Sequence, residues 1–205
     1  MTWKDVISNK RHLLQIILSV LIIAGVLWSL TNFLRFIEIR QGIVLPDPLL
    51  NRFSPVNLTW LIFGLIYISL ILAIIDLVKY PQQFIIIIQS YSLLVLIRML
   101  AMYLMPLNPP ADMIPLNDPF VQYFGTGKLL TKDLFFSGHT ATLFLLFLAV
   151  QNKKLKAVFL ACTVIVALSV LLQHVHYAID VLAAPFFSYS SYKLIILLQN
   201  RYLKY

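Results

Sequence analysis

Long, uninterrupted apolar runs constrain this chain more than any other feature of its sequence. An α-helix needs about 20 predominantly apolar residues to cross a hydrocarbon core about 30 Å thick. Six stretches approach or meet this standard, and they cover residues 13–34, 60–78, 84–105, 134–150, 155–173 and 178–199. Lipid cannot hydrogen-bond free backbone groups, and continuous runs do not fit the alternating pattern of barrel strands. We therefore predict an all-α integral membrane protein with six transmembrane helices, formed as a single domain over residues 1–205.

The composition agrees with a membrane location and excludes several other classes. The chain is 60% hydrophobic and only 12% charged, with a mean hydropathy of +0.88, whereas soluble domains are about a quarter charged. These values argue against a soluble enzyme, a disordered tail or a disulfide scaffold. The net charge of +8 is better explained by basic loops at an anionic membrane surface than by a nucleic-acid partner. The single cysteine, Cys162, excludes an intramolecular disulfide and a cysteine-cluster zinc site.

The basic residues in the loops and near the ends of the spans predict the orientation, because the cytoplasmic side carries an excess of Lys and Arg. Ten fall on the side of the termini: Lys4, Lys10, Arg11, Lys79, Lys153, Lys154, Lys156, Lys193, Arg201 and Lys204. Five fall on the other side: Arg35, Arg40, Arg52, Lys128 and Lys132. We therefore expect both termini in the cytoplasm and the loops 35–59, 106–133 and 174–177 on the outer face. The compact size suggests the plasma membrane of a microbe.

Ionisable side chains inside the predicted spans are costly, so each is a functional hypothesis by default. Arg98, His139 and Asp180 lie near the outer ends of their spans and His176 immediately precedes the sixth, although the orientation was assigned without them. Asp76 lies near an inner end, three residues from Lys79, and we interpret it as half of an interfacial ion pair. We interpret His12 and His174 as interfacial residues.

The outer cluster contains the parts of a phosphoryl-transfer site. His176 and Asp180 are four residues apart and share a face of a continuous helix, so the carboxylate can accept the Nδ1 proton and leave Nε2 as nucleophile or base. His139 follows Ser137 and Gly138 at a helix start, where free N–H groups and the positive end of the helix dipole can receive an anion.

Arg98 adds a planar charge suited to phosphate, and no part of this set requires a metal or a cofactor. A metal site from His139, His174, His176 and Asp180 is the alternative. We disfavour it because an H-x-H pair suits a strand better than a helix.

The same residues fall in segments that resemble the signature sequences of the sphingomyelin synthase family. The sequence DLFFSGHT at 133–140 is similar to its third signature, and HYAIDV at 176–181 is similar to its fourth. LPDP at 45–48 and RMLAMY at 98–103 resemble the first and second. The order and the six-span layout match, so the likeness covers nearly the whole chain. This family is a branch of the type-2 phosphatidic acid phosphatase superfamily, so the resemblance implies a helical bundle of that kind.

The resemblance implies a role for each catalytic residue. His176 would attack the phosphorus of a phospholipid headgroup and form a phosphohistidine, and Asp180 would orient the imidazole. His139 would protonate the departing diacylglycerol oxygen and then act as base on the incoming hydroxyl.

The resemblance also suggests how substrate is held. Arg98 would bind the phosphate oxygens at the helix start formed by Ser137 and Gly138, while Asp47 and Asp133 would line the substrate entrance.

We therefore expect a membrane lipid phosphotransferase that needs no cofactor and no nucleic acid. Its donor would be a glycerophospholipid such as phosphatidylcholine or phosphatidylethanolamine, and its acceptor a lipid alcohol such as ceramide or diacylglycerol. A lipid phosphatase or phospholipase-C-like hydrolase would use the same phosphoenzyme, with water as acceptor. A non-enzymatic transporter or scaffold is the more distant alternative. The sequence leaves the headgroup, the acceptor and the oligomeric state open.

Overall fold

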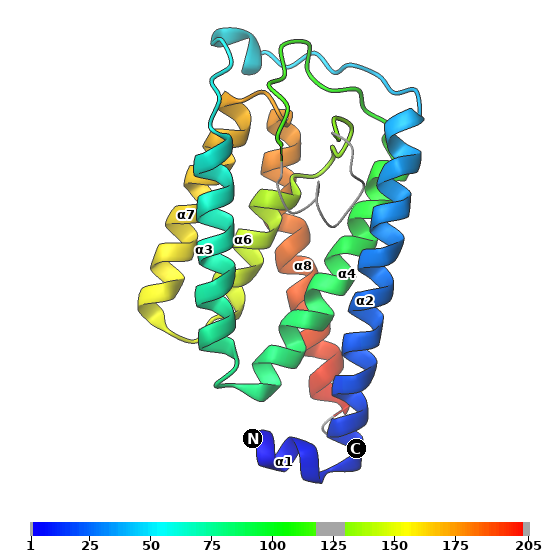
Figure 1. Cartoon of the computed structure of the whole chain (residues 1–205), viewed down its shortest axis with the longest axis vertical. Coiled ribbons are helices and arrows are strands. Elements are labelled where there is room, and N and C mark those ends of the chain that lie inside the picture. The colour runs from blue at the N-terminus through cyan, green and yellow to red at the C-terminus, as the bar shows by residue number, and fades with distance from the viewer. Residues whose placement is uncertain (1, 118–129, 203–205) are drawn as a thin grey trace.

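The computed structural model describes residues 2–117 and 130–202, and these residues form a bundle of helices (Figure 1). The elements, in chain order, are α1 (Trp3–Ser8), α2 (Lys10–Ile39), the 3-10 turn η1 (Leu50–Arg52), α3 (Thr59–Leu77), α4 (Pro81–Leu104), α6 (Gly138–Ala149), α7 (Lys153–Leu172) and α8 (Ala178–Tyr202). Figure 1 shows both termini at one end of the bundle and the long connections at the other. We call these the terminus end and the loop end.

Five of these helices, α2, α3, α4, α7 and α8, are long and apolar enough to cross a bilayer. Their outward faces carry large apolar side chains that remain exposed, such as Trp60 at 83% and Leu182 at 74%. Water would make such a surface unfavourable, whereas a hydrocarbon environment would not. The described residues therefore fit a multi-pass integral membrane protein, and the all-helical prediction is confirmed.

The predicted span 134–150 differs most from its expectation. The structure begins the corresponding helix, α6, only at Gly138, which leaves 12 residues, or roughly 18 Å of helix at the usual rise. That is less than the about 30 Å needed to cross the hydrocarbon core. Residues 134–137 run without helical structure, and protein groups satisfy their backbone: the Phe136 carbonyl accepts from Arg98 Nε at 2.9 Å and Ser137 N donates to the Asp180 carbonyl at 3.1 Å. Such backbone is tolerated at membrane depth because it is buried in protein.

Helix packing divides the bundle into two sides around α6. The α6 helix packs against α3, α4, α7 and α8, and its residues Ala141, Leu145 and Ala149 belong to the largest buried apolar cluster. On one side α2 packs along α4, and on the other α3 packs along α7 (Figure 1). The α2 and α3 helices therefore lie on opposite sides of a shared interior.

Two buried polar residues tie the loops together at the loop end. Gln173 accepts a hydrogen bond from Leu58 N at 2.9 Å and donates to Thr59 Oγ1 at 2.9 Å and the Ile114 carbonyl at 3.0 Å. The hydroxyl of Tyr177 donates to the Asn108 carbonyl at 2.8 Å and accepts from Leu45 N at 3.2 Å. Burial raises the pKa of this phenol. These bonds hold both long connections against the segment that precedes α8.

Asp76 does not form the predicted ion pair with Lys79. Its carboxylate is buried and accepts hydrogen bonds from Gln151 N at 2.9 Å and Asn152 N at 3.5 Å. These N–H groups lie in the short connection between α6 and α7, just before α7 begins. The carboxylate therefore stabilises this turn. The sequence around Asp76 did not predict this role, because the turn lies 75 positions away along the chain.

Candidate active site

His176 and Asp180 form a buried pair at the start of α8. His176 Nδ1 lies 3.3 Å from Asp180 Oδ2, and the two side chains are 1% and 0% exposed. The same carboxylate oxygen accepts from Tyr177 N at 3.2 Å, which suits an acidic group in the first turn of a helix. His176 lies in the turn before the helix rather than on it, yet the predicted four-residue spacing still brings the two side chains together. This contact leaves Nε2 as the ring nitrogen that does not face the carboxylate.

His139 lies in the first turn of α6 and faces this pair. Its ring centroid is 6.2 Å from that of His176, with an angle of 61° between the ring planes, and 5.9 Å from that of Phe63. The hydrogen bond from Ser137 N to the Asp180 carbonyl joins the backbone before α6 to the first turn of α8. The two imidazoles are thus held close by a direct link between the segments that carry them.

Ser137 is the N-cap of α6. Its hydroxyl oxygen accepts from Thr140 N at 3.4 Å and lies 3.1 Å from Thr140 Oγ1. A serine at this position satisfies one of the free N–H groups of the first turn. The remaining N–H groups of this turn leave α6 with a positive end beside His139.

Arg98 lies against the start of α6 and is buried. Its Nε donates to the Phe136 carbonyl at 2.9 Å, and its Nη2 lies 2.8 Å from Asp133 Oδ1 and donates to the Asp133 carbonyl at 3.3 Å. A Cβ atom placed on Gly138 would lie only 2.8 Å from Arg98 Cζ and 2.9 Å from Nη1. Glycine is therefore required for the guanidinium to approach the helix this closely.

Asp133 is partly exposed, and its ion pair compensates the charge of the buried guanidinium. Asp133 lies next to the site, where it was predicted to line the substrate entrance. Its carboxylate is paired with Arg98. The Nη1 atom of Arg98 lies on the side of the guanidinium that faces Gly138 and the start of α6.

An apolar cavity of about 560 Å³ extends from this site into the bundle. Arg98, Asp133, Gly138 and His139 line it near the loop end, and Tyr67, Tyr91 and Thr142 are its other polar residues. The rest of its wall consists of aliphatic and aromatic side chains from α2, α3, α4 and α6. A charged group and a histidine therefore lie at one end of a space suited to hydrocarbon.

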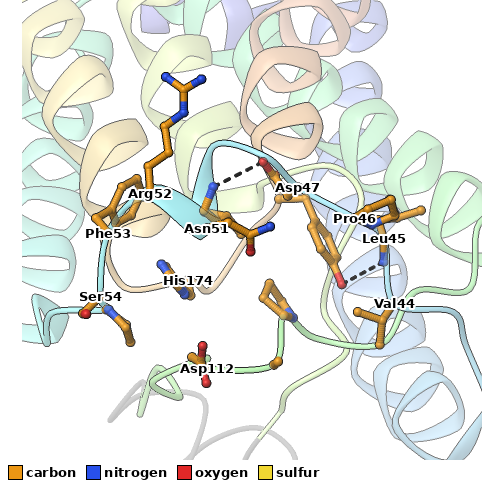
Figure 2. A pocket seen from close by; sticks show the side chains of 15 residues that line it. Val44, Leu45, Pro46, Asp47, Asn51, Arg52, Phe53, Ser54, Asp112 and His174 are labelled. Atoms are coloured by element: carbon orange, nitrogen blue, oxygen red, sulfur yellow. Dashed lines mark hydrogen bonds between the residues drawn. The ribbon is translucent and has the colours of Figure 1, made fainter.

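A second pocket, of about 900 Å³, opens at the loop end and includes Asp47 and His174 in its wall (Figure 2). Asp47 Oδ2 accepts from Ala178 N at 2.7 Å and Oδ1 accepts from Leu49 N at 3.0 Å, so this carboxylate caps the N-terminus of α8. Asp47 was predicted at the substrate entrance; the structure shows that both of its oxygens hold backbone groups.

His174 is buried in the turn before α8, where it adopts a positive φ of 54° and packs edge-to-face on Phe53 at 5.3 Å. It does not contact the pair that His176 forms with Asp180. Across residues 2–117 and 130–202 we find no cluster of three or more His, Cys, Asp or Glu side chains that could bind a metal ion.

Sequence reasoning missed two residues of this region. Phe63 packs on the His139 ring, but nothing in the sequence distinguishes it from the other apolar residues of the span 60–78. Tyr177 joins both long connections to the segment that holds the histidine pair. Its place within the segment at 176–181 was the one available signal.

Comparison with known protein families gives a match in the C-terminal part of the chain. Residues 132–197 match the family model described as PAP2 superfamily C-terminal. No curated protein and no solved structure matches the chain. The matched segment contains α6, α7 and most of α8, and with them His139, His176 and Asp180. The match supports membership of the type-2 phosphatidic acid phosphatase superfamily, and with it a lipid enzyme of the general phosphatase or phosphotransferase type.

Proposed function

We propose that this protein transfers a phosphorylated headgroup from a glycerophospholipid to a lipid alcohol such as ceramide, through a phosphohistidine on His176. The observation that carries the proposal is the contact between His176 Nδ1 and Asp180 at 3.3 Å, with the His139 ring 6.2 Å away. The resemblance of 133–140 and 176–181 to sphingomyelin synthase signatures supports the choice of reaction.

In the first half-reaction His176 is the nucleophile. Asp180 holds the proton on Nδ1, so the Nε2 lone pair is available to phosphorus. The bond between Nε2 and phosphorus forms as the bond from phosphorus to the diacylglycerol oxygen breaks. His139, in its protonated form, gives its proton to that oxygen. In the second half-reaction neutral His139 removes the proton of the acceptor hydroxyl, whose oxygen attacks phosphorus and releases His176.

The separation of the two imidazoles suits this sequence. A reacting phosphorus lies roughly 3–3.5 Å from its nucleophile, and a general acid lies roughly 2.6–3.2 Å from the oxygen that it protonates. A ring-centroid separation of 6.2 Å places both imidazoles beside the same small volume, so one phosphoryl group there could contact both. Arg98 Nη1 and the N-terminus of α6 are the groups that would compensate its negative charge.

The surroundings of the site favour a lipid acceptor over water. His176 and Asp180 are buried, and His139 faces a cavity whose wall is mostly apolar. Exclusion of water protects a phosphoenzyme from hydrolysis. The hydrolase remains the second candidate because the matched superfamily takes its name from a phosphatase.

We also propose that the loop end faces the outside of the cell. The count of Lys and Arg in the sequence, ten on the side of the termini against five on the other, supports this orientation, although Lys204 and Lys128 lie outside the described residues. Cysteine accessibility at exposed positions of each end, probed in intact cells with an impermeant reagent, would test it.

The reaction is tested by product analysis with the purified protein in lipid nanodiscs. Phosphatidylcholine, phosphatidylethanolamine or phosphatidic acid is supplied with and without ceramide or diacylglycerol, and the lipids are identified by mass spectrometry. A transferase makes a new phospholipid only when the alcohol is present. A hydrolase releases diacylglycerol and a phosphorylated headgroup, or phosphate from phosphatidic acid, without it.

Single-residue variants separate both enzymes from a transporter or scaffold. We expect His176→Ala and His139→Ala each to remove the activity. Leu96→Ala, on the exposed apolar face of α4, is the matched control and retains it. Undiminished activity in both histidine variants would overturn the proposed mechanism.

A further inference from the structure

The inner end of the apolar cavity is lined by α3 and α4, and a third element packs behind them. Leu77 at the end of α3 and Phe84 in the first turn of α4 line this end of the cavity. Behind them lies the short helix α1, which Figure 1 shows crossing the terminus end of the bundle. The Trp3 ring contacts Phe84 edge-on at a centroid distance of 5.9 Å.

Further contacts hold α1 in this position. Trp3 Nε1 donates to the Val78 carbonyl at 2.5 Å, and Val6 is fully buried. Thr2 and Asp5 form a reciprocal capping box at the start of the helix. Trp3 therefore supports the Phe84 ring from below, and α1 is a fixed part of the inner end.

The two ends of the cavity define its length. Arg98 and Phe84 both line it and lie on the same helix, 14 residues apart, which corresponds to roughly 21 Å of helical rise. One leaflet contributes about half of a hydrocarbon core about 30 Å thick, or roughly 15 Å. The cavity thus extends beyond the depth of one leaflet, which suits a lipid chain in an extended conformation.

The cavity margin is accessible to lipid. Leu27 of α2 and Leu70 and Ile74 of α3 line the cavity, yet each is about 40% exposed or more. Since α2 packs on α4 and α3 packs on α7, these residues lie on the two opposite margins of the interior. A hydrocarbon chain can therefore enter from the side while its phosphate stays at the loop end.

We propose that this cavity holds one hydrocarbon chain of the lipid substrate, and that Phe84, supported by Trp3, sets the longest chain that fits. The proposal rests on the proposed function for the place of the phosphate, beside His139 and Arg98. A methylene that moves from the bilayer into the cavity leaves hydrocarbon rather than water, so it gains only packing contacts with the apolar wall, and kcat/KM should rise weakly with chain length. A methylene beyond the Phe84 ring finds no space, so the activity should fall above a limiting length.

Two variants should move this limit in opposite directions. Phe84→Ala opens the inner end, so the preferred chain becomes longer. Ile88→Phe fills the cavity one helical turn above Phe84, at a half-buried position, so the preferred chain becomes shorter. Trp3→Ala leaves the lining intact but removes the support, so it should broaden the upper limit. Leu96→Ala on the exposed face of α4 is the control and should leave the profile unchanged.

The measurement is the relative kcat/KM for a series of phospholipids whose saturated chains differ by two carbons. A ratio between chain lengths does not depend on how much of each variant folds. We expect the maximum to shift by at least one step of the series, upward in Phe84→Ala and downward in Ile88→Phe. Identical profiles in wild type and both variants would overturn the proposal.

A parallel binding experiment keeps this inference separate from the proposed function. Non-hydrolysable alkyl phosphonates of graded length are titrated into the same purified proteins, and thermal stabilisation is recorded. If wild type turns over no phospholipid, the proposed function fails, whereas a length limit that follows Phe84 and Ile88 still supports the chain site. If no phosphonate stabilises wild type, or if thermal stabilisation depends on chain length in the same way in wild type and both variants, the chain site is refuted.

Discussion

Gly138→Ala is the substitution whose effect can be worked most directly from the structure. The new methyl carbon would lie 2.8 Å from Arg98 Cζ, 2.9 Å from Nη1 and 3.1 Å from Nη2. Carbon atoms in contact are normally about 3.5–4.0 Å apart, so the guanidinium has to move. It is held from the other side by the Phe136 carbonyl and by Asp133, at 2.9 and 2.8 Å. Movement therefore weakens at least one hydrogen bond of a buried charge.

The expected loss of activity follows from the hydrogen bond that the displaced guanidinium would otherwise make to the substrate phosphate. Hydrogen bonds to charged groups contribute about 1.5–3 kcal/mol, which corresponds to a roughly tenfold to hundredfold lower kcat/KM if Arg98 is displaced from the phosphate. Stability should change less. Alanine favours a helix over glycine by about 1 kcal/mol, while the added methyl costs about 1–3 kcal/mol of overpacking, so the two effects partly cancel.

The assay is the initial rate of headgroup release from phospholipid in nanodiscs, together with the melting temperature. Gly64→Ala is the matched control, because a Cβ at that position meets no atom within 4 Å, and it should retain full activity. In an Arg98→Ala background the Gly138→Ala change should cost less than about twofold, since the group it displaces is gone. A wild-type rate in Gly138→Ala, or an equal loss in both backgrounds, would refute the steric explanation.

Three further changes test the pair and the loop end. Asp180→Asn should lower kcat by at least about a hundredfold, with the melting temperature less affected, because the amide stabilises a charged His176 poorly. Gln173→Leu should destabilise the protein by about 2 kcal/mol or more, since it leaves buried backbone groups of the loops without partners. Tyr177→Phe should lower the melting temperature at neutral pH. The difference in melting temperature between this variant and wild type should become smaller above pH 10.0, the ordinary pKa of tyrosine.

The sign of the Tyr177 effect follows from its raised pKa. The folded state retains the phenolic proton more tightly than the unfolded state, so this contribution is complete below the unfolded pKa and is lost as the pH rises through the folded pKa. A constant difference between Tyr177→Phe and wild type from pH 7 to pH 11 would contradict it. For the other two changes, a wild-type kcat in Asp180→Asn or a wild-type melting temperature in Gln173→Leu would be the contradicting result.

Local sequence was enough to predict the helices and the closest pair of the site. The apolar runs gave the five long helices because hydropathy and helical length are properties of short segments. The spacing of His176 and Asp180 predicted their contact because they are only four positions apart in the sequence. The positions of Arg98 and His139 near one end of their helices followed from the same count of residues.

Contacts between distant segments decided the rest. Leu134 and Phe136 were predicted at the start of a span, yet other parts of the protein bury them. Hydropathy identifies an apolar side chain, but it does not show whether that side chain will contact lipid or the protein interior. The entrance role of Asp47 stays a prediction, and only the structure revealed that its carboxylate caps α8, 131 positions away in the sequence. Nothing in the first turn of the chain indicated that Trp3 would pack on Phe84, which lines a cavity whose other end holds Arg98. The sequence determined which segments form membrane helices and which of them carry the reactive groups, since both depend on a few neighbouring residues. Only the tertiary structure decided what those groups contact and how deep the cavity is, because both depend on where chains far apart in sequence pack together.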